Sequence, residues 1–442
     1  MVLTIFTKRS YILFVYSMRF FFLLIISWIT FPAFSQDTLR VMHYNLLNYG
    51  NYTSYCTTGN NNHEDKDGLI RTIIDYELPD IFTVNEINRY EFYQNRLLTS
   101  VLNTGGRTWY KRGSISNQAL SDLVNMLYYN SDKLVLKSHE VVQSQLRDID
   151  LFTLYLKNDN LSRGDTVYLH CLIAHLKAGS TASDEAERSV MTTNAINYLK
   201  THKQAGNYLM MGDFNTYSSS EACYQDLIDL SNGVFRFFDP VNKAGNWSGN
   251  SSFASVHTQS VTTASNGCLS GGGMDDRFDH IMVTSPLING TMGLKYQTDS
   301  YHALGQDGKH FNKSITDSPA NTSVPAAVLN ALVNNSDHLP VSMKLLTTSG
   351  SPGSIEEQTF YSMSGVYHRA NGETVLVFTA KSVVNAEVGI YTLTGQLVNS
   401  EMVGVNAGRN ETVLETGNLK KGVYLIRISD SQRRTAVIKM VR

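Results

Sequence analysis

Short apolar runs that each end in polar side chains recur along this chain, and they constrain the fold more than any other feature. The apolar run at residues 209–211 stops at Gly212, and Asp213 and Asn215 follow it closely. Runs of the same kind begin near residues 39, 81 and 167. A short apolar run bounded by polar and turn-forming residues is typical of a buried β-strand. We therefore expect several buried strands whose carboxyl ends carry polar side chains.

Segments with helical spacing separate these strands. The apolar residues within 69–74 recur at helical intervals, and Pro79 ends that helix. The segment "SDEAERSVMTTNAINYLKTH" predicts a second helix, with Ser183 as its N-cap and acidic residues in its first turn. Strands that alternate with helices indicate an α/β layered domain with its site along a sheet edge. We assign this domain to residues 36–347.

The rest of the chain has a different character. The 442 residues exceed one ordinary domain and suit two. Residues 348–358 are rich in Ser and Gly and predict a linker. Residues 359–442 contain short strand-like runs separated by Gly and Asn, which favours a small all-β sandwich.

The amino terminus has the features of a signal peptide. Three basic residues precede the apolar run at residues 20–31, and the small residues Ala33 and Ser35 follow it. The alternative is a membrane anchor, but the run is short, so we expect cleavage after Ser35 and no membrane span afterwards. Cleavage of residues 1–35 removes three basic residues and no acids, which takes the formal net charge from −2 to about −5. This charge excludes a global basic field for nucleic acid.

Four cysteines bear on the redox state of the chain. The absence of a CxxC pair argues against a zinc knuckle, and export permits disulfides. Cys171 lies inside a predicted strand and is expected in the core. One bridge is expected among Cys56, Cys223 and Cys268, and the pairing stays open.

The polar residues at strand ends form a set with shared chemistry. Each one alone is an ordinary turn residue. Together they offer hard oxygen ligands, which suit Mg²⁺, Mn²⁺ or Ca²⁺, and imidazoles beside carboxylates, which suit proton transfer or phosphate contact. This combination fits metal-assisted hydrolysis of a phosphodiester. The set comprises Asn45, Glu86, His175, Asp213, Asn215, Asp279, Asp337 and His338.

Six motifs within residues 39–346 resemble the endonuclease/exonuclease/phosphatase superfamily, which includes pancreatic-type deoxyribonucleases, exonuclease III-like nucleases and bacterial sphingomyelinases. In chain order they are "YNLLN", "VNEI", "AHLKAG", "GDFN", "RFDHIMV" and "SDHLPV". The resemblance implies two packed mixed β-sheets flanked by helices, with the site at one rim. This chain has Asn85 where the family often has Gln before its metal-binding Glu.

The resemblance also implies roles on the metal side of the site. Asn45 matches an asparagine near the metal, and Glu86 matches the main metal carboxylate. Asp337 matches an acid on the metal side. The expected ion is Mg²⁺, with Mn²⁺ or Ca²⁺ as alternatives.

The other matched positions are expected to act on the phosphate. His175 matches a histidine that contacts phosphate or donates a proton. Asp213 and Asn215 match the pair at the attacking water and the phosphate. Asp279 matches the acid that orients His338, and either His338 or Asp213 can serve as the general base.

The tail resembles the C-terminal sorting domain of type IX secretion substrates. The segment "VGIYTLTGQLV" is followed by "LKKGVYLIRI" and a closing "AVIKMVR". The resemblance implies handling by the type IX secretion machinery and a secreted or cell-surface protein. The alternative is a carbohydrate-binding or adhesive β-module.

These features predict a secreted, divalent-metal-dependent phosphodiesterase, in particular an endonuclease that hydrolyses DNA or RNA as a monomer. The first alternative is a sphingomyelinase-like enzyme or another phosphodiesterase that does not act on nucleic acid. The second is a surface binding module with a dead site. A nuclease should carry a local basic rim, for which Lys111 and Arg112 are the candidates, whereas a lipid enzyme should expose an apolar hairpin.

Overall fold

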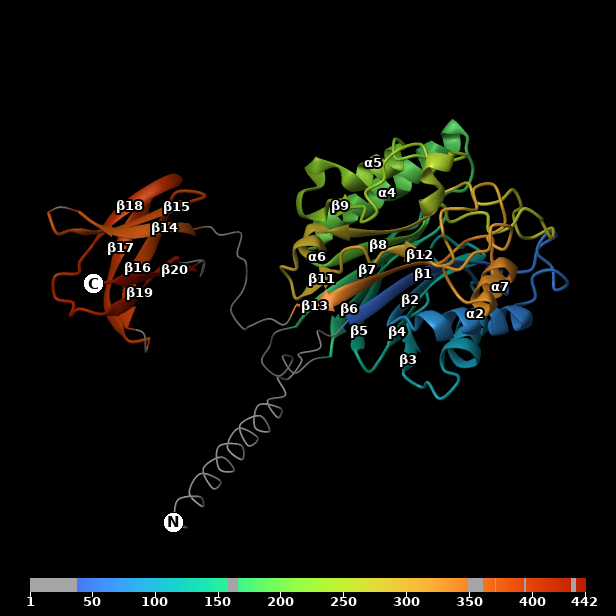
Figure 1. The fold of residues 1–442 in the computed structure, drawn as a ribbon, viewed down its shortest axis with the longest axis horizontal. Helices are drawn as coiled ribbons and strands as arrows, with labels where there is room; N and C mark the ends of the chain where they lie inside the picture. The colour runs from blue at the N-terminus through green and yellow to red at the C-terminus, as the bar shows by residue number, and fades with distance from the viewer. Residues whose placement is uncertain (1–37, 158–165, 349–360, 370, 393–394, 431–434) are drawn as a thin grey trace, which may run out of the picture. The chain divides into compact units, whose positions relative to one another are not determined.

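A computed structural model describes residues 38–157, 166–348, 361–369, 371–392, 395–430 and 435–442. The expected signal peptide lies outside these residues, as does all but one residue of the expected linker. The chain divides into two compact units, Met1–Ser349 and Gly350–Arg442. We describe each unit by itself (Figure 1).

The first unit contains two mixed β-sheets, each with one parallel pair of strands. The first sheet has the order β11-β13-β1-β2-β4-β3, with β12 also paired to β13, and only β1 and β2 run parallel. Its strands are β1 (Thr38–Tyr49), β2 (Ile81–Asn88), β3 (Tyr110–Arg112), β4 (Leu123–Asn130), β11 (Leu294–Tyr296), β12 (His302–Ala303) and β13 (Val341–Thr347).

The second sheet has the order β5-β6-β7-β8-β10-β9, and only β7 and β8 run parallel. Its strands are β5 (Leu134–Gln143), β6 (Ile149–Leu156), β7 (Tyr168–His175), β8 (Tyr208–Asp213), β9 (Phe237–Phe238) and β10 (Asp279–Thr284).

Helices cover the outer face of each sheet. Within each parallel pair the chain crosses over through a helix, α2 between β1 and β2 and α4 between β7 and β8. Helices α2 and α7 lie together against the first sheet, and α4 and α5 lie against the second (Figure 1). The helical segments are α2 (His63–Glu77), α3 (Glu91–Arg96), η1 (Leu97–Leu102), α4 (Ala182–His202), α5 (Ala222–Ile228), η3 (Leu230–Phe235), η4 (Ser251–Val256), α6 (Ser285–Asn289) and α7 (Ala326–Asn335).

Alternating side chains of the strands build three apolar layers. Val41, Leu209 and Met211 face the layer between the two sheets, whereas Met42 and Met210 face the outer layers under the helices. Successive residues of a strand point to opposite faces, so a strand that is apolar throughout must be covered on both sides. The predicted α/β fold of two packed mixed sheets flanked by helices is confirmed.

The second unit is an all-β sandwich. One sheet has the order β14-β15-β18 and the other has the order β17-β16-β19-β20. Side chains from both sheets share one buried core, which includes Phe378, Ile390 and Ile426. The predicted small all-β domain is therefore confirmed. Its strands are β14 (Tyr361–His368), β15 (Thr374–Ala380), β16 (Val384–Thr392), β17 (Leu397–Val405), β18 (Gly408–Leu414), β19 (Val423–Asp430) and β20 (Thr435–Val441).

The N-cap expected for α4 is wrong by two residues. Thr181, not Ser183, caps the helix, because the Thr181 hydroxyl accepts a hydrogen bond from the Asp184 backbone N–H. The Asp184 carboxylate accepts one from the Thr181 N–H in return. This reciprocal capping box satisfies two donors at once, which a cap at Ser183 would not do with this spacing.

The open cysteine pairing resolves to Cys56 and Cys268, which form a disulfide. Cys223 is buried and free, and Cys171 is buried in β7 as expected. The bridge joins the loop after β1 to the loop before β10. Next to the bridge, Asn60 and Asn266 exchange hydrogen bonds from side-chain amide to backbone carbonyl, at 3.1 and 3.0 Å.

Candidate active site

The carboxyl ends of the two parallel strand pairs supply the centre of the site. Asn45 of β1 lies opposite Asn85 of β2, where the regular pairing of these two strands ends, and His175 ends β7 beside Asp213 of β8. Ligands of layered α/β folds bind outside the carboxyl ends of such strands. The strand ends that the sequence singled out are therefore brought together by the packing of the two sheets.

Glu86 is aimed into the site by an irregular backbone. The strand pairing of β2 shifts register between Val84 and Ile87, and Glu86 has a φ of 59°. A bulge of this kind redirects a side chain, and a left-handed non-glycine residue is uncommon outside functional or turn positions. The backbone N–H of Asn48 donates to Glu86 Oε2 at 2.9 Å and fixes the carboxylate.

Asn45 links the two carboxylates of the site. Its Nδ2 donates to Glu86 Oε1 at 3.1 Å and to Asp213 Oδ2 at 3.0 Å. Its Oδ1 accepts from the backbone N–H of Leu47 at 2.9 Å. In this arrangement Asn45 orients the carboxylates with its amide nitrogen.

Gly212 allows the approach of β7 and β8 that places Asp213. Its φ is 152°, and a Cβ at this position would lie 1.8 Å from the carbonyl oxygen of Ala174. The Asp213 N–H donates to Asn85 Oδ1 at 2.9 Å, and Asp213 Oδ1 accepts from the Asn215 N–H at 3.0 Å. The Asn215 side chain donates to a backbone carbonyl of the neighbouring loop, that of Leu176, at 3.2 Å. Asp213 is thus fixed through both its backbone N–H and its carboxylate, and Asn215 is fixed through its side chain.

Glu86, His175 and Asp213 could hold a metal ion, because their ligand atoms lie within 4.8 Å of one another. His175 Nε2 lies 3.6 Å from Asp213 Oδ2 and 3.7 Å from Glu86 Oε1. Burial lowers the pKa of His175 well below its ordinary value of 6.5, and the charges of Arg147 and His338 lower it further. The imidazole is therefore neutral at physiological pH and has a lone pair to offer a cation.

The charge of this cluster fits a divalent cation. Burial raises the pKa of Asp213 to about 7, and the charges of Asp279 and Glu86 add to the effect while that of His338 opposes it. Two carboxylates that repel each other in a buried site are stabilised by a cation between them. The two carboxylates are donors that suit Mg²⁺ and Mn²⁺, whereas an imidazole is more typical of transition-metal sites, so the carboxylates carry the assignment.

His338 and Asp279 form a second, adjoining pair. His338 Nδ1 lies 2.8 Å from Asp279 Oδ2, and its Nε2 lies 3.7 Å from Asp213 Oδ2. Burial opposes a charge on His338, but Asp279 and Asp213 outweigh it and raise the pKa of the imidazole well above 6.5. The amide nitrogen of Gln259 lies 3.0 Å from His338 Nε2, a contact that suits a neutral ring. The charges of two buried carboxylates stabilise the protonated ring more than one amide contact stabilises the neutral ring. We therefore assign the charged imidazolium to His338.

Asp337 approaches the site through His338. Its Oδ1 lies 3.9 Å from His338 Nε2, and its Oδ2 accepts from the Ser270 N–H at 3.1 Å and from Gln259 Nε2 at 3.4 Å. Oδ1 is buried and has no hydrogen-bond partner. Asp337 therefore has a free oxygen at the site, although it lies outside the cluster of Glu86, His175 and Asp213.

Sequence reasoning missed supporting residues that have no pattern of their own. Lys66 is buried in α2 and donates to the carbonyls of Leu47 and Asn335, at 3.1 and 2.5 Å. Burial lowers its pKa to about 7, although the charges of Asp337 and Glu86 oppose the shift. In the sequence Lys66 lies between two aspartates, a pattern typical of the solvent-exposed start of a helix. Gln259 lies before β10 in a segment that contains none of the six motifs.

Residues 370–441 match the secretion system C-terminal sorting domain. The resemblance of the tail to this family is confirmed, and it marks the chain for secretion or attachment to the cell surface through the type IX system. No curated protein is similar to this chain at a significant level. Within the described residues, no helix combines the length and apolar character needed to cross a membrane.

Several solved structures resemble the first unit. The human Nocturnin catalytic domain has 16% identity and a TM-score of 0.44, over 72% of this chain and 99% of that one. TDP2 of D. rerio in complex with a single-strand DNA product has 12% identity and a TM-score of 0.42, over 70% and 100%. An endonuclease/exonuclease/phosphatase family protein from Bacteroides thetaiotaomicron has 16% identity and a TM-score of 0.43, over 72% and 98%. Similarity of this degree assigns no activity, which has to be inferred from the site itself.

Proposed function

We propose that this chain is an exported, divalent-metal-dependent phosphoester hydrolase. The observation that carries the proposal is that Asp213 belongs to two groups at once. Its Oδ2 lies 3.6 Å from His175 Nε2, on the side of the cation cluster, and 3.7 Å from His338 Nε2, on the side of the acid–base pair. A cation site beside a proton-transfer site is what metal-assisted attack of water on a phosphoester requires.

Within this proposal, the residues of the site divide the work. Glu86, Asp213 and His175 would hold the cation, and Asp337 offers a further carboxylate oxygen nearby. A bound divalent cation supplies positive charge that stabilises the phosphate in the transition state. Asn45 keeps the two cluster carboxylates in place for it.

The acid–base step involves the other pair. Asp213 takes a proton from the attacking water; burial raises its pKa and a bound cation would lower it again, so the carboxylate stays ionised and able to accept a proton at neutral pH. His338 keeps its positive charge beside Asp279 and stabilises negative charge on a phosphate oxygen. The reverse assignment, with neutral His338 as the base, would keep the Nδ1 proton directed at Asp279 and would require an unprotonated Nε2, which the charges of Asp279 and Asp213 oppose.

For the substrate, we propose a phosphodiester of nucleic acid, cleaved internally by the monomeric chain with Mg²⁺. The sequence motifs are shared by nucleases and sphingomyelinases, so support for this class comes from two aromatic side chains that follow Glu86. Tyr90 and Phe92 are 59% and 61% exposed, and exposed aromatic rings stack on nucleobases. The expected basic rim gives less support, because Arg112 is held by Glu91 and Asn95.

The experiment is a substrate panel on the purified mature chain. DNA, RNA and sphingomyelin vesicles are incubated with Mg²⁺ and with excess chelator, for the wild type and for Glu86→Gln. We expect cleavage of nucleic acid that both the chelator and the variant abolish. Full turnover in excess chelator would refute metal dependence. Cleavage of sphingomyelin alone would refute the nuclease and favour the lipid phosphodiesterase, for which Tyr90 and Phe92 would then be membrane contacts.

A further inference from the structure

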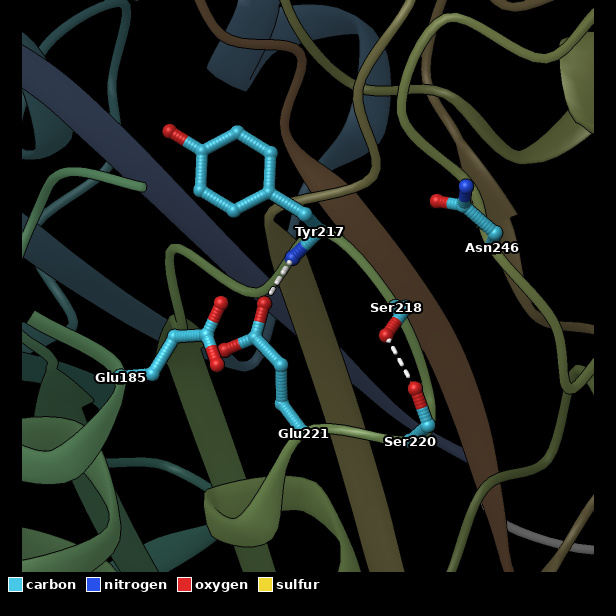
Figure 2. A pocket seen from close by; sticks show the side chains of 6 residues that line it. All are labelled: Glu185, Tyr217, Ser218, Ser220, Glu221 and Asn246. Carbon is cyan, nitrogen blue, oxygen red and sulfur yellow. Dashed lines mark hydrogen bonds between the residues drawn. The ribbon is translucent and has the colours of Figure 1, made fainter. Parts of the chain in front are cut away.

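An open pocket of about 300 Å³ lies on the loop that follows the Asp213–Asn215 pair. Figure 2 shows its lining, in which Ser218 and Ser220 share a hydrogen bond of 2.7 Å and the side chain of Asn246 lies across from them. The volume is at the low end of ligand pockets and suits a single ring system. The lining residues are Glu185, Tyr217, Ser218, Ser220, Glu221 and Asn246.

The pocket adjoins the candidate active site. Tyr217 follows Asn215 by two residues, and its ring centroid lies 5.1 Å from that of Phe278, which in turn lies 6.4 Å from that of His338. Burial raises the pKa of Tyr217, and the charge of Asp213 is among the further causes. The first turn of α4 carries Glu185. It lies near the same sheet edge because α4 begins a few residues after His175, the last residue of β7. The pocket and the candidate active site are therefore built on the same loop, and the subsite requires that the group attached to the phosphate extends along this loop to Tyr217.

The loop that forms the pocket is held firmly before any ligand binds. The Tyr217 N–H donates to Glu221 Oε1 at 2.7 Å, as Figure 2 shows, and the Tyr217 carbonyl accepts from the Trp247 N–H at 3.0 Å. Behind the pocket, Glu221 Oε2 accepts from Arg188 Nε and Nη2, at 2.9 and 2.6 Å. These bonds satisfy the Glu221 carboxylate, so Glu221 forms part of the pocket wall. The other polar side chains of the lining stay available to bind a ligand.

The chemistry of the lining selects an uncharged ring with hydroxyl groups. Two of the six lining residues are carboxylates and none is basic, so the lining offers no cationic partner to a phosphate and favours an uncharged part of the substrate. Glu185 accepts hydrogen bonds, and Ser218, Ser220 and Asn246 both donate and accept them. The partly exposed ring of Tyr217 offers an apolar face to the C–H side of a sugar.

We propose that this pocket is a subsite for a hydroxyl-bearing sugar joined to the scissile phosphate. The proposal rests on the proposed phosphoester hydrolase. Two kinds of ligand would present such a sugar: a ribonucleotide, through its ribose, and a free hexose phosphate. Both carry the hydroxyl groups that the pocket would bind. Deoxyribose has one hydroxyl fewer and should bind less well.

Calorimetric binding of three probes in the presence of Mg²⁺ tests the subsite without requiring turnover. The probes are ribose 5-phosphate, 2-deoxyribose 5-phosphate and glucose 6-phosphate. The variants are Asn246→Ala and Glu185→Gln, both at exposed positions, and the matched control is Glu187→Gln, two residues along the same helix and outside the lining. Residues two apart on a helix face different directions.

We expect each pocket variant to weaken binding of a hydroxyl-rich sugar phosphate by about two- to tenfold, which is the range that one hydrogen bond supplies. The control should bind like the wild type. A loss confined to ribose 5-phosphate identifies a ribonucleotide source, and a loss confined to glucose 6-phosphate identifies a free hexose. Unchanged binding of every probe to both variants would overturn the subsite, as would equal losses for ribose and deoxyribose.

A parallel measurement separates this inference from the proposed function. Hydrolysis of bis(4-nitrophenyl) phosphate, a diester without a sugar, reports the metal-dependent chemistry alone. We expect the wild type and the Glu187→Gln control to hydrolyse it equally. Absence of hydrolysis in the wild type would refute the proposed function, whereas the binding data would still decide whether the pocket takes a sugar.

Discussion

Replacing Asp279 by asparagine should lower the upper pH limit of catalysis. Asp279 is fully buried, and its Oδ2 lies 2.8 Å from His338 Nδ1. Asparagine keeps the shape and an oxygen that can accept the hydrogen bond, but it removes the negative charge. The imidazolium of His338 would then lose the carboxylate that contributes most to its raised pKa.

The size of the effect follows from the hydrogen bond that is weakened. A buried hydrogen bond to a charged group contributes about 1.5–3 kcal/mol. One pKa unit corresponds to about 1.4 kcal/mol, so the pKa of His338 should fall by about one to two units. At a pH above both pKa values, where the charged fraction of His338 falls tenfold per pH unit in each protein, the rate of the variant should lie about ten- to 150-fold below that of the wild type.

The sign of the pH dependence tests the assigned roles. The rate should rise with pH as Asp213 loses its proton, near pH 7 or below it once a cation binds, because a cation favours the carboxylate. It should fall again as pH rises through the raised pKa of His338. The assay is kcat/KM for bis(4-nitrophenyl) phosphate against pH at saturating Mg²⁺, with Asp276→Asn as the control. The Asp276 carboxylate lies near enough to His338 to interact by charge but does not bond to it.

We expect Asp279→Asn to move the alkaline limb to lower pH and Asp276→Asn to move it less. If His338 acted as a neutral base, the acid limb would move instead, and the variant would gain activity at low pH. Either that result or a profile identical to the wild type would refute the reasoning.

Three further predictions concern the metal, the fold and the tail. Glu86→Gln should weaken Mn²⁺ binding at least tenfold in a calorimetric titration, because one charged donor is lost. Circular dichroism should show an intact fold, and unchanged affinity would contradict the proposed cation site of Glu86, His175 and Asp213. Glu221→Gln should lower the free energy of unfolding in urea by about 3–5 kcal/mol because Arg188, with its side chain 0% exposed, loses its charged partner. Asp122→Asn, which breaks an ion pair whose side chains are 39% and 72% exposed, should cost less than about 1 kcal/mol, and equal losses would refute the argument. Deleting residues 359–442 should trap the enzyme in the periplasm, and unchanged release on cell fractionation would contradict a sorting role.

The strand framework and the residues of the site could be predicted because both follow from short-range patterns. The apolar run before Gly212 predicts β8, and strict alternation explains how Leu209 and Met211 face one core while Met210 faces another. The polar strand ends meet because parallel strands begin and end together. This reason covers His175 and Asp213, whereas Asp279 begins β10 and His338 precedes β13, so these two could be placed at the same site only by the family motifs.

The remaining features depend on long-range packing, which leaves no local pattern. Gln259 reaches His338 from a segment 79 residues away, and Lys66 reaches Asn335 from 269 residues away. The pairing of Cys56 with Cys268 likewise depends on where two loops meet. Thr181 took the cap from Ser183 because its partner Asp184 could return the hydrogen bond, a choice between neighbours that the cap preference of either residue leaves open.

The disulfide also makes the structure beside the site depend on the compartment in which the protein is found. Cys56 and Cys268 hold together two loops, and the second of these donates the Ser270 N–H to Asp337. Bridges of this kind form in oxidising compartments and stay open in the reducing cytoplasm. We therefore expect the bridge to fix the loop beside Asp337 only after the chain has left the cytoplasm. We expect the newly made enzyme to remain latent among the phosphoesters of its own cell and to become competent outside, where it can act without harm to its maker.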